Sequence, residues 1–461
     1  MKKYIREGLP YYKRMLIIAV PIMIQNGVTN FVNMLDNIMV GQVGTAEMTG
    51  VSIVNQLFFV FNLCIFGALS GAGIFTAQFY GKKDTDGIRT TFQYKIISAI
   101  ILTVIGVCVF VFAGEFLISA YIDKNASAEE AATVLGFAVS YLKIMLIQTL
   151  PFAIAQSYAS SLRETNDRLI PMIATIAAVL VNLVLNYILI FGHFGFPAMG
   201  IEGAAIATVI ARFAECFILV IRAHTKTTKY PFVKKLYTRF TFTPALIGKI
   251  TVVTLPLLLN EGLWSGGMAF LNQCYSIRGL DVVAAINIVS TLNNVFNVSF
   301  IAFGSAIGII LSQTLGAGKK EEAKKASSRL VWFSVLVIVF VALLMMCFAP
   351  FFPRIYNTSD EIKTLATGLL FIIAAFMPVQ ALNNSCYFTL RSGGKTFITF
   401  LFDSGFMWCV SASLAFCLSR FTDMPIQQLY TCVLSMDIIK GILGYIFMKK
   451  GIWLNVVVNE N

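Results

Sequence analysis

The chain has 461 residues, of which 57% are hydrophobic and only 13% are charged, and it carries a formal net charge of +12. Soluble domains carry about a quarter charged residues, so this composition excludes a soluble enzyme and also a disordered chain. We therefore expect an all-α polytopic membrane protein, because each membrane span needs about 20 apolar residues.

Apolar runs separated by breakers predict twelve transmembrane helices. In chain order they are 15–40, 51–79, 93–120, 131–159, 169–191, 201–222, 247–274, 282–315, 327–350, 362–388, 397–419 and 427–448. Of the 35 Lys and Arg residues, 27 fall in loops on one side, with Lys95 counted among them, and five fall on the other. By the positive-inside rule, we expect both termini to be cytoplasmic. We expect the protein to be a multi-pass protein of the cell (inner) membrane. Because this basic charge orients the chain, we expect no nucleic-acid partner.

The longest polar break, residues 223–246, divides the chain into two halves of six spans. We expect an N-terminal lobe (1–222), a basic cytoplasmic linker (223–246) and a C-terminal lobe (247–461). Shifting residues 21–81 by 235 positions gives 15 identities in 61, and a second match pairs Leu162-Arg163 with Leu390-Arg391. The first set includes Pro21/Pro256, Gln78/Gln313 and Gly81/Gly316. This duplication predicts two pseudo-symmetric six-helix lobes around a central cavity.

Four segments carry a family resemblance: FGALSGAGIFTAQFYGKK, its repeat partner FGSAIGIILSQTLGAGKK, the loop RETNDRLIP, and NLVLNYILIFG followed by GIEGAAIATVIAR. Together they resemble the multidrug and toxic compound extrusion (MATE) transporters of the bacterial NorM/DinF-like type. The resemblance implies export of organic cations driven by inward movement of Na+ or H+. It implies no cofactor beyond that coupling ion.

Asp36 is the first candidate for the coupling site, because a charge inside a bilayer costs at least about 2.5 kcal/mol and needs a reason. It lies at the end of a row of polar side chains on one helical face, which Asn26, Asn30, Asn33 and Asn37 form. The resemblance makes this aspartate the ion site and adds Asn182, Asn186 and Thr208 as its partners. One version of the family pattern has an acid where Asn186 stands. The coupling ion is therefore either Na+ bound at Asp36 or a proton carried by Asp36.

Glu261 is the deeper intramembrane acid and the second candidate for coupling. It could also bind a cationic substrate or hydrogen-bond neighbouring amides. Polar, aromatic and Met side chains of the first, seventh, eighth and tenth spans are candidates for lining a substrate cavity. They are Asn26, Asn30, Trp264, Met268, Asn287, Asn294, Asn383 and Asn384.

The other intramembrane charges suggest packing roles. We expect Arg212 with Glu215, and Asp437 with Lys440, to pair on their own helices and anchor them. Asp403 is expected to hydrogen-bond a neighbour. Pro21 removes a helix hydrogen bond and is a candidate hinge in the first span.

These features predict a secondary active exporter that works by alternating access, with small, cationic, partly aromatic substrates. Because two lobes are already fused in one chain, we expect a monomer. The main alternative is a flippase or exporter of lipid-linked or other anionic metabolites of the same broad superfamily. A membrane-embedded enzyme is disfavoured because the spans contain no cluster of nucleophile, base or metal ligands. A passive channel is a further alternative.

Overall fold

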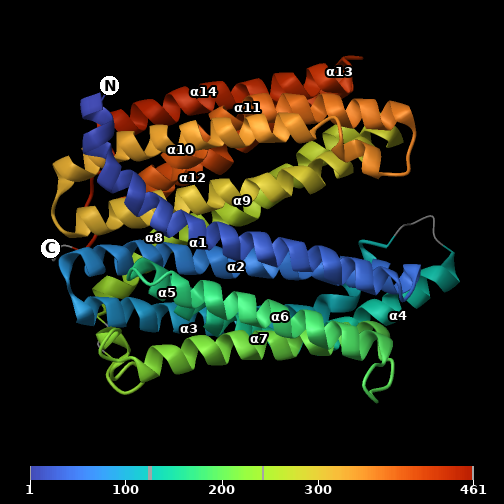
Figure 1. The fold of residues 1–461 in the computed structure, drawn as a ribbon, viewed down its shortest axis with the longest axis horizontal. Coiled ribbons are helices and arrows are strands. Elements are labelled where there is room, and N and C mark those ends of the chain that lie inside the picture. Colours follow the sequence, from blue (N-terminus) through green and yellow to red (C-terminus); the bar gives the residue numbers. More distant parts are fainter. Residues whose placement is uncertain (1, 123–126, 241–242, 459–461) are drawn as a thin grey trace. The chain divides into compact units, whose positions relative to one another are not determined.

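The computed structural model describes residues 2–122, 127–240 and 243–458 (Figure 1). Over these residues the chain is helical and has no strand, and twelve helices are long and apolar enough to cross a membrane. The predicted all-α class and the twelve spans are therefore confirmed.

In the described residues of the first half of the chain, seven α-helices make six spans. They are α1 (Lys2–Gly41), α2 (Thr45–Lys82), α3 (Thr85–Ser119), α4 (Ala128–Met145), α5 (Thr149–Glu164), α6 (Leu169–Phe191) and α7 (Gly200–Thr225). A 3₁₀ turn, η1 (Leu146–Gln148), joins α4 to α5, so these two helices form one span. The turn precedes Pro151, which cannot donate the hydrogen bond that would continue a regular helix across the joint.

The second half begins after a polar segment that contains the 3₁₀ turn η2 (Pro231–Val233). Its α-helices are α8 (Pro244–Ser276), α9 (Leu280–Gly316), α10 (Lys320–Phe348), α11 (Asp360–Ser392), α12 (Thr396–Phe400), α13 (Ser413–Phe421) and α14 (Ile426–Lys450). A short 3₁₀ helix, η3 (Phe352–Ile355), follows α10. Between α12 and α13 run two π-helical segments, η4 (Leu401–Gly405) and η5 (Met407–Ala412), so the eleventh span is continuous but irregular.

The chain forms two compact units that are not contiguous in sequence. The N-unit consists of residues 24–76 and 84–254, and the C-unit of residues 1–23, 77–83 and 255–461. Within the N-unit α7 packs against α4, α5 and α6, and within the C-unit α11 packs against α9, α10 and α14. The predicted lobe boundaries at the linker 223–246 stay a prediction.

Three helices, α1, α2 and α8, pass from one unit to the other, and α1 and α8 do so beside a proline. Helix α1 changes unit between residues 23 and 24, just after Pro21, and α8 changes unit between residues 254 and 255, just before Pro256. A proline inside a helix leaves the carbonyl four residues earlier without its usual donor. The repeat-related prolines therefore weaken α1 and α8 near the residues at which these two helices change unit.

In the C-unit, the last turns of α2 and α9 cross at backbone contact through repeat-related residues. A Cβ atom added to Gly81 would lie 2.0 Å from the Gln313 carbonyl oxygen, and one added to Gly316 would lie 1.9 Å from the Gln78 carbonyl oxygen. Only glycine permits two helices to approach so closely. The shift of 235 residues that revealed the repeat thus converts one contact into the other, because it pairs Gly81 with Gly316 and Gln78 with Gln313.

The segment after α14 binds at this crossing. The Gln78 side chain donates to the carbonyl oxygens of Ser392 (3.2 Å) and Asn455 (3.3 Å), and its Oε1 accepts from the Val457 amide (2.8 Å). Arg14 near the start of α1 donates to Gln313 Oε1 at 2.5 Å. The beginning of α1 and the segment after α14 therefore lie at the same end of the C-unit.

Candidate functional site

In the N-unit, Asp36 of α1 meets the two asparagines of α6. Its carboxylate is half-buried, and its Oδ1 accepts a hydrogen bond from Asn186 Nδ2 at 2.7 Å. Asn182 and Asn186 are both buried and lie one helical turn apart, so both side chains face α1 and α7. Asn182 in turn lies 3.2 Å from Thr208 Oγ1 of α7. The structure thus brings four of the residues predicted for ion coupling together.

The Asn182 amide can take two orientations, and the first places its Oδ1 2.9 Å from Asp36 Oδ2, where two oxygens need a proton between them. In one, its Nδ2 donates to Thr208 Oγ1 at 3.2 Å and its Oδ1 accepts from Asn186 Nδ2 at 3.3 Å. In the other, its Nδ2 donates to Asp36 Oδ2 at 2.9 Å and its Oδ1 accepts from Thr208 at 3.2 Å. An ionised carboxylate only accepts hydrogen bonds, so the second orientation suits ionised Asp36.

The same site contains an unused acceptor. Within the described part of the chain, the buried Oδ1 of Asn186 has no hydrogen-bond partner. Buried polar atoms are rarely left without a partner, and an amide oxygen beside a carboxylate is the kind of ligand that hard cations prefer. The donor set of Asp36, Asn182, Asn186 and Thr208 therefore fits Na+.

The remaining predicted residues of α1 lie outside this cluster. Asn33 and Asn30 are exposed, and Asn26 is half-buried. Asn33 precedes Asp36 by one turn on the same face, so it can approach a ligand at Asp36 from the exposed side. The structure shows no contact that joins it to Asn182 or Asn186.

In the C-unit the predicted residues are spread over three helices. Glu261 of α8 is half-buried, with Trp264 and Met268 exposed on the following turns. Asn287 and Asn294 are exposed on α9. On α11, half-buried Asn384 lies against Gly304 of α9, whereas buried Asn383 donates to the backbone carbonyl of Asp437 on α14 at 3.0 Å. Asn383 thus packs between two helices of the C-unit.

A polar cluster that sequence reasoning missed lies next to Glu261. Asn260 Nδ2 donates to Asp403 Oδ2 at 3.0 Å, and Lys440 Nζ donates to Asp403 Oδ1 at 2.7 Å. The predicted pairing of Lys440 with Asp437 is therefore corrected, because Lys440 pairs with Asp403 of the eleventh span, and the Asp437 carboxylate is hydrogen-bonded by Gln380. The expectation that Asp403 bonds a neighbour is confirmed.

The N-unit holds a related arrangement. Gln25 of α1 donates to Thr175 of α6 at 2.9 Å, Thr175 donates to Glu215 of α7 at 2.7 Å, and Arg212 pairs with Glu215 at 2.9 Å. The predicted Arg212–Glu215 pair is thus confirmed.

The repeat relates the two clusters. A shift of 235 pairs Gln25 with Asn260, and the shift of 228 seen for Arg163/Arg391 pairs Thr175 with Asp403 and Arg212 with Lys440. Extending the repeat alignment to these helices was the signal that could have located both clusters.

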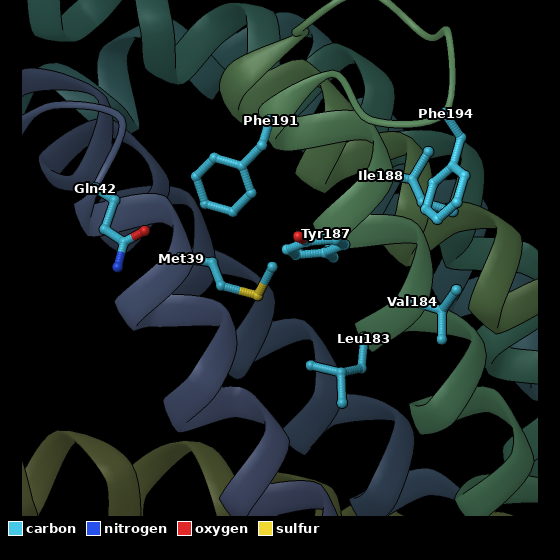
Figure 2. Close-up of a pocket in the computed structure, with 8 residues that line it drawn as sticks. All are labelled: Met39, Gln42, Leu183, Val184, Tyr187, Ile188, Phe191 and Phe194. Atoms are coloured by element: carbon cyan, nitrogen blue, oxygen red, sulfur yellow. The ribbon is translucent and has the colours of Figure 1, made fainter.

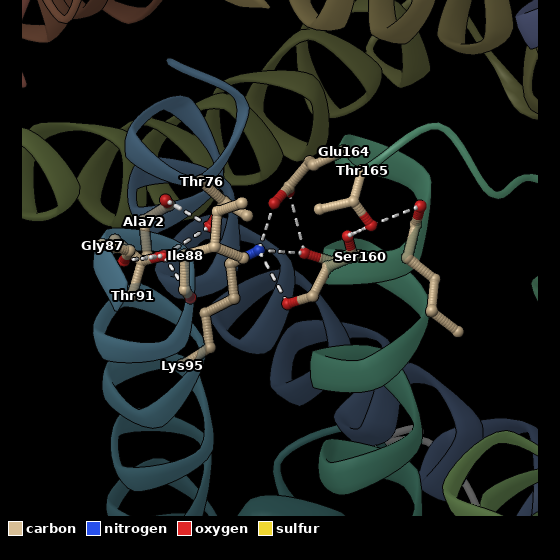
Figure 3. Close-up of polar contacts among 11 residues, drawn as sticks. Ala72, Thr76, Gly87, Ile88, Thr91, Lys95, Ser160, Glu164 and Thr165 are labelled. Atoms are coloured by element: carbon tan, nitrogen blue, oxygen red, sulfur yellow. Dashed lines mark hydrogen bonds and ion pairs between the residues drawn. The ribbon is translucent and has the colours of Figure 1, made fainter. Parts of the chain in front are cut away.

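Lys95 provides another correction. We expected it in a cytoplasmic loop, but it lies inside α3 with its side chain fully buried. Its ammonium donates to Ser160 Oγ at 2.7 Å and Ser161 Oγ at 3.3 Å, and it pairs with Glu164 of α5 (Figure 3). A buried charge is tolerated only when it is paired and hydrogen-bonded, as it is here.

The loop RETNDRLIP contributes a second ion pair. Asp167 is buried and accepts hydrogen bonds from Lys229 and Tyr230 of the polar segment between α7 and α8. Burial by itself would raise the pKa of Asp167, but the hydrogen bonds from Lys229 and Tyr230 outweigh it and hold that pKa below its ordinary value.

An apolar pocket of about 470 Å³ lies between α1 and α6. Figure 2 shows the Met39 side chain directed toward Tyr187, with Phe191 above them. Met39 follows Asp36 by three residues, so the pocket begins one turn from the carboxylate. Its lining consists of Met39, Gln42, Leu183, Val184, Tyr187, Ile188, Phe191 and Phe194.

Comparison with known proteins places the chain in a family. Residues 21–188 and 256–414 match the MatE family model, which covers well over half of the sequence. The chain belongs to the MatE family. MATE proteins are membrane transporters, which agrees with the prediction that this chain is not an enzyme. The two matched segments begin at the repeat-related residues Pro21 and Pro256.

Individual MATE relatives match along nearly the whole length. The "Probable multidrug resistance protein NorM" of Thermotoga maritima is 25% identical, over 98% of this chain and 96% of its own. Among solved structures, the outward-facing conformation of a multidrug resistance MATE family transporter of the MOP superfamily gives a TM-score of 0.86 at 19% identity, with 96% of each chain covered. A mutant of the Vibrio cholerae MATE transporter VcmN gives 0.87 at 16% identity, covering 98% of this chain and 99% of its own.

Proposed function

We propose that this MATE transporter is a secondary active multidrug exporter that exchanges organic cations for Na+ or H+. The observation that carries the proposal is the half-buried Asp36 carboxylate, which is held by Asn186 beside a buried amide oxygen without a partner. A carboxylate inside a membrane span is retained when it binds something, and these neighbours provide ligands for a cation. The names of its relatives add multidrug resistance as the physiological class.

A proton can be coupled through the orientation of Asn182. When Asp36 is protonated, its hydroxyl can donate to Asn182 Oδ1 across the 2.9 Å that separates the two oxygens. When Asp36 is ionised, the amide turns so that Nδ2 donates instead, and its contact with Thr208 of α7 exchanges donor for acceptor. Protonation of Asp36 on α1 would thereby change the hydrogen bond between Asn182 of α6 and Thr208 of α7.

Na+ can be coupled by the same residues. It would take the Asp36 carboxylate, the free Asn186 oxygen and the oxygens of Asn182 and Thr208, all hard ligands. Either ion neutralises Asp36. We infer that the organic cation competes for this negative charge, and that the apolar pocket beginning at Met39 receives the aromatic part of the substrate. Glu261 is proposed as a second coupling or substrate-binding acid.

The conformational change is proposed to bend α1 at Pro21. The support is that α1 and α8 pass between the two units within two residues of Pro21 and Pro256, where each helix lacks a backbone hydrogen bond. We further infer that the protein works as a monomer without a cofactor in the cell (inner) membrane. The start of α1 and the segment after α14 share one end of the C-unit, as cytoplasmic placement of both termini requires.

The test is efflux of a fluorescent cationic dye from proteoliposomes, with Na+ and pH gradients imposed separately. Wild type, Asp36→Asn and Glu261→Gln are compared with Gly27→Ala. This last variant is the control on α1, because a Cβ atom at Gly27 would meet nothing within 4 Å. We expect one gradient to drive efflux in wild type and Gly27→Ala, and Asp36→Asn to abolish it.

Unimpaired gradient-driven efflux by Asp36→Asn would reject Asp36 as the coupling residue. No efflux under either gradient, from protein that is folded and monodisperse, would reject the antiporter. It would favour the alternative, a flippase or exporter of lipid-linked or other anionic metabolites, which is then assayed with a fluorescent anionic lipid.

A further inference from the structure

We propose that Asp403 in the C-unit is a binding site for primary ammonium groups, and that Lys440 occupies this site as a tethered ligand of the chain itself. The site lies in the membrane-spanning part of the C-unit, formed by α8, α11, α14 and the π-helical segment η4. The proposal does not depend on ion coupling at Asp36, because every contact that carries it lies within the C-unit.

The wall of the site is built from buried polar side chains. Asn260 is 2% exposed and donates to Asp403 Oδ2 at 3.0 Å. Its own Oδ1 accepts from the Ser404 hydroxyl at 2.7 Å and from the Ser404 amide at 3.3 Å. Tyr387 lies 3.4 Å from Asn260 Nδ2. This shell leaves Oδ1 of Asp403 for one cationic donor, and Lys440 supplies it.

The backbone at the site is irregular where the ligands are. Phe402, Asp403 and Ser404 are consecutive residues of the π-helical segment η4. A π-helical segment widens a helical turn and is frequently found at functional sites. Here it lets Asp403 bind the ammonium and Phe402 place its ring 5.3 Å from the same nitrogen, while Ser404 supports Asn260. A carboxylate and an aromatic face are the two groups that bind organic ammonium ions.

Carboxyl groups outnumber basic side chains around the site. Asp437 lies one turn before Lys440 on α14, and Asp403 and Arg391 act electrostatically on Glu261. Three acids, Glu261, Asp403 and Asp437, thus face two basic side chains, Arg391 and Lys440. Removing Lys440 therefore leaves the Asp403 carboxylate without the cationic partner that it has in the structure.

Lys440 is held far less completely than the buried lysine of the N-unit. Lys95 uses two serine hydroxyls and Glu164 (Figure 3). Its side chain is 0% exposed. Among the described residues Lys440 Nζ makes a single hydrogen bond, and the side chains of Lys440 and Asp403 keep 13% and 17% exposure. An ammonium has three donors, so two of them have no acceptor among the residues that the structure describes. The site of Lys95 is closed to solvent, whereas the site of Lys440 is partly open, so a free ammonium ion can displace Lys440 from Asp403.

The test removes the tethered ligand and supplies a free one. Lys440→Ala deletes three carbons and the ammonium, which n-propylammonium restores. We expect the Tm of purified Lys440→Ala protein to rise by about 2 °C or more, saturably, with n-propylammonium, because a ligand that binds only the folded state stabilises it. Tetramethylammonium, which has no N–H donor, should not reproduce the rise. Wild type should respond at much higher amine concentration.

Two matched variants decide the interpretation. Asp403→Asn combined with Lys440→Ala should lose the response, and Lys95→Ala should not show it, because its site is closed to solvent. If Lys440→Ala cannot be purified folded, Lys440→Ser, which leaves nearly the same space, is measured in the same way. A folded Lys440 variant without an amine response, or an equal response from Lys95→Ala, would overturn the proposal. Failure of dye efflux would leave this result untouched, so the two proposals fail separately.

Discussion

Substituting alanine for Gly316 should destabilise the C-unit through one atom. The added Cβ would lie 1.9 Å from the Gln78 carbonyl oxygen, and 2.5 Å from both the carbonyl carbon and Cα of Gln78. A carbon and an oxygen that are not bonded normally stay more than about 3.3 Å apart. The helices α2 and α9 must therefore separate by more than an ångström at the crossing, because the atoms that collide belong to the backbone and cannot rotate away.

The cost should exceed that of ordinary overpacking. Overpacking a core costs about 1 to 3 kcal/mol, and separating the helices also stretches the hydrogen bonds that Gln78 makes to Ser392, Asn455 and Val457. We expect Gly316→Ala to lower the free energy of unfolding by about 3 kcal/mol, measured by thermal unfolding of protein purified in detergent. Gly81→Ala should behave alike, because its Cβ would lie 2.0 Å from the Gln313 oxygen.

Gly262→Ala is the matched control. Gly262 is also a repeat-related glycine inside a helix, but a Cβ atom there would meet nothing within 4 Å. Alanine favours a helix over glycine, so this variant should be neutral or slightly stabilising. If Gly316→Ala unfolds at the same temperature as Gly262→Ala, the close crossing of α2 and α9 does not exist in the protein, and the argument fails.

Three further outcomes test other parts of the structure. Glu164→Gln should cost about 3 to 5 kcal/mol by leaving the buried Lys95 unpaired, and combining it with Lys95→Met should recover much of this loss in thermal unfolding. Asp167→Asn should weaken the attachment of the segment around Lys229 by about 1 to 2 kcal/mol at neutral pH, seen as faster proteolysis there. Because the native pKa of Asp167 lies below its unfolded value, this stabilisation is complete above about pH 4 and is lost as the pH falls through the native pKa, so wild type and Asp167→Asn should converge in acid. Thr208→Ala should remove the hydrogen-bond partner of Asn182 and weaken the binding of the coupling ion several-fold. The measurement is the ion concentration that gives half-maximal efflux. An unchanged midpoint would contradict the proposed role of Thr208.

Prediction from sequence succeeded where the signal was periodic or repeated. Apolar runs located the twelve spans, and the i,i+4 spacing of Asn182 and Asn186 placed both on one face, where the structure has them beside Asp36. It failed where the partner lay on another helix. Lys440 was paired with Asp437 because both are on α14, yet it bonds Asp403, and Lys95 was placed in a loop although Glu164 holds it inside the fold.

The sequence by itself determined the membrane class, the number of spans, the internal repeat and the acids that need an explanation. The class, the spans and the acids follow from hydropathy and from the cost of charge in a bilayer, which act on each segment separately. The repeat follows from comparing the sequence with itself. The tertiary structure alone decided which groups meet: the crossing of Gly81 and Gly316, the second orientation of Asn182, and the ammonium of Lys440 on Asp403. Such contacts depend on helix rotation and on the π-helical turn at Asp403, and an amphipathic pattern does not encode either with the accuracy that a hydrogen bond requires.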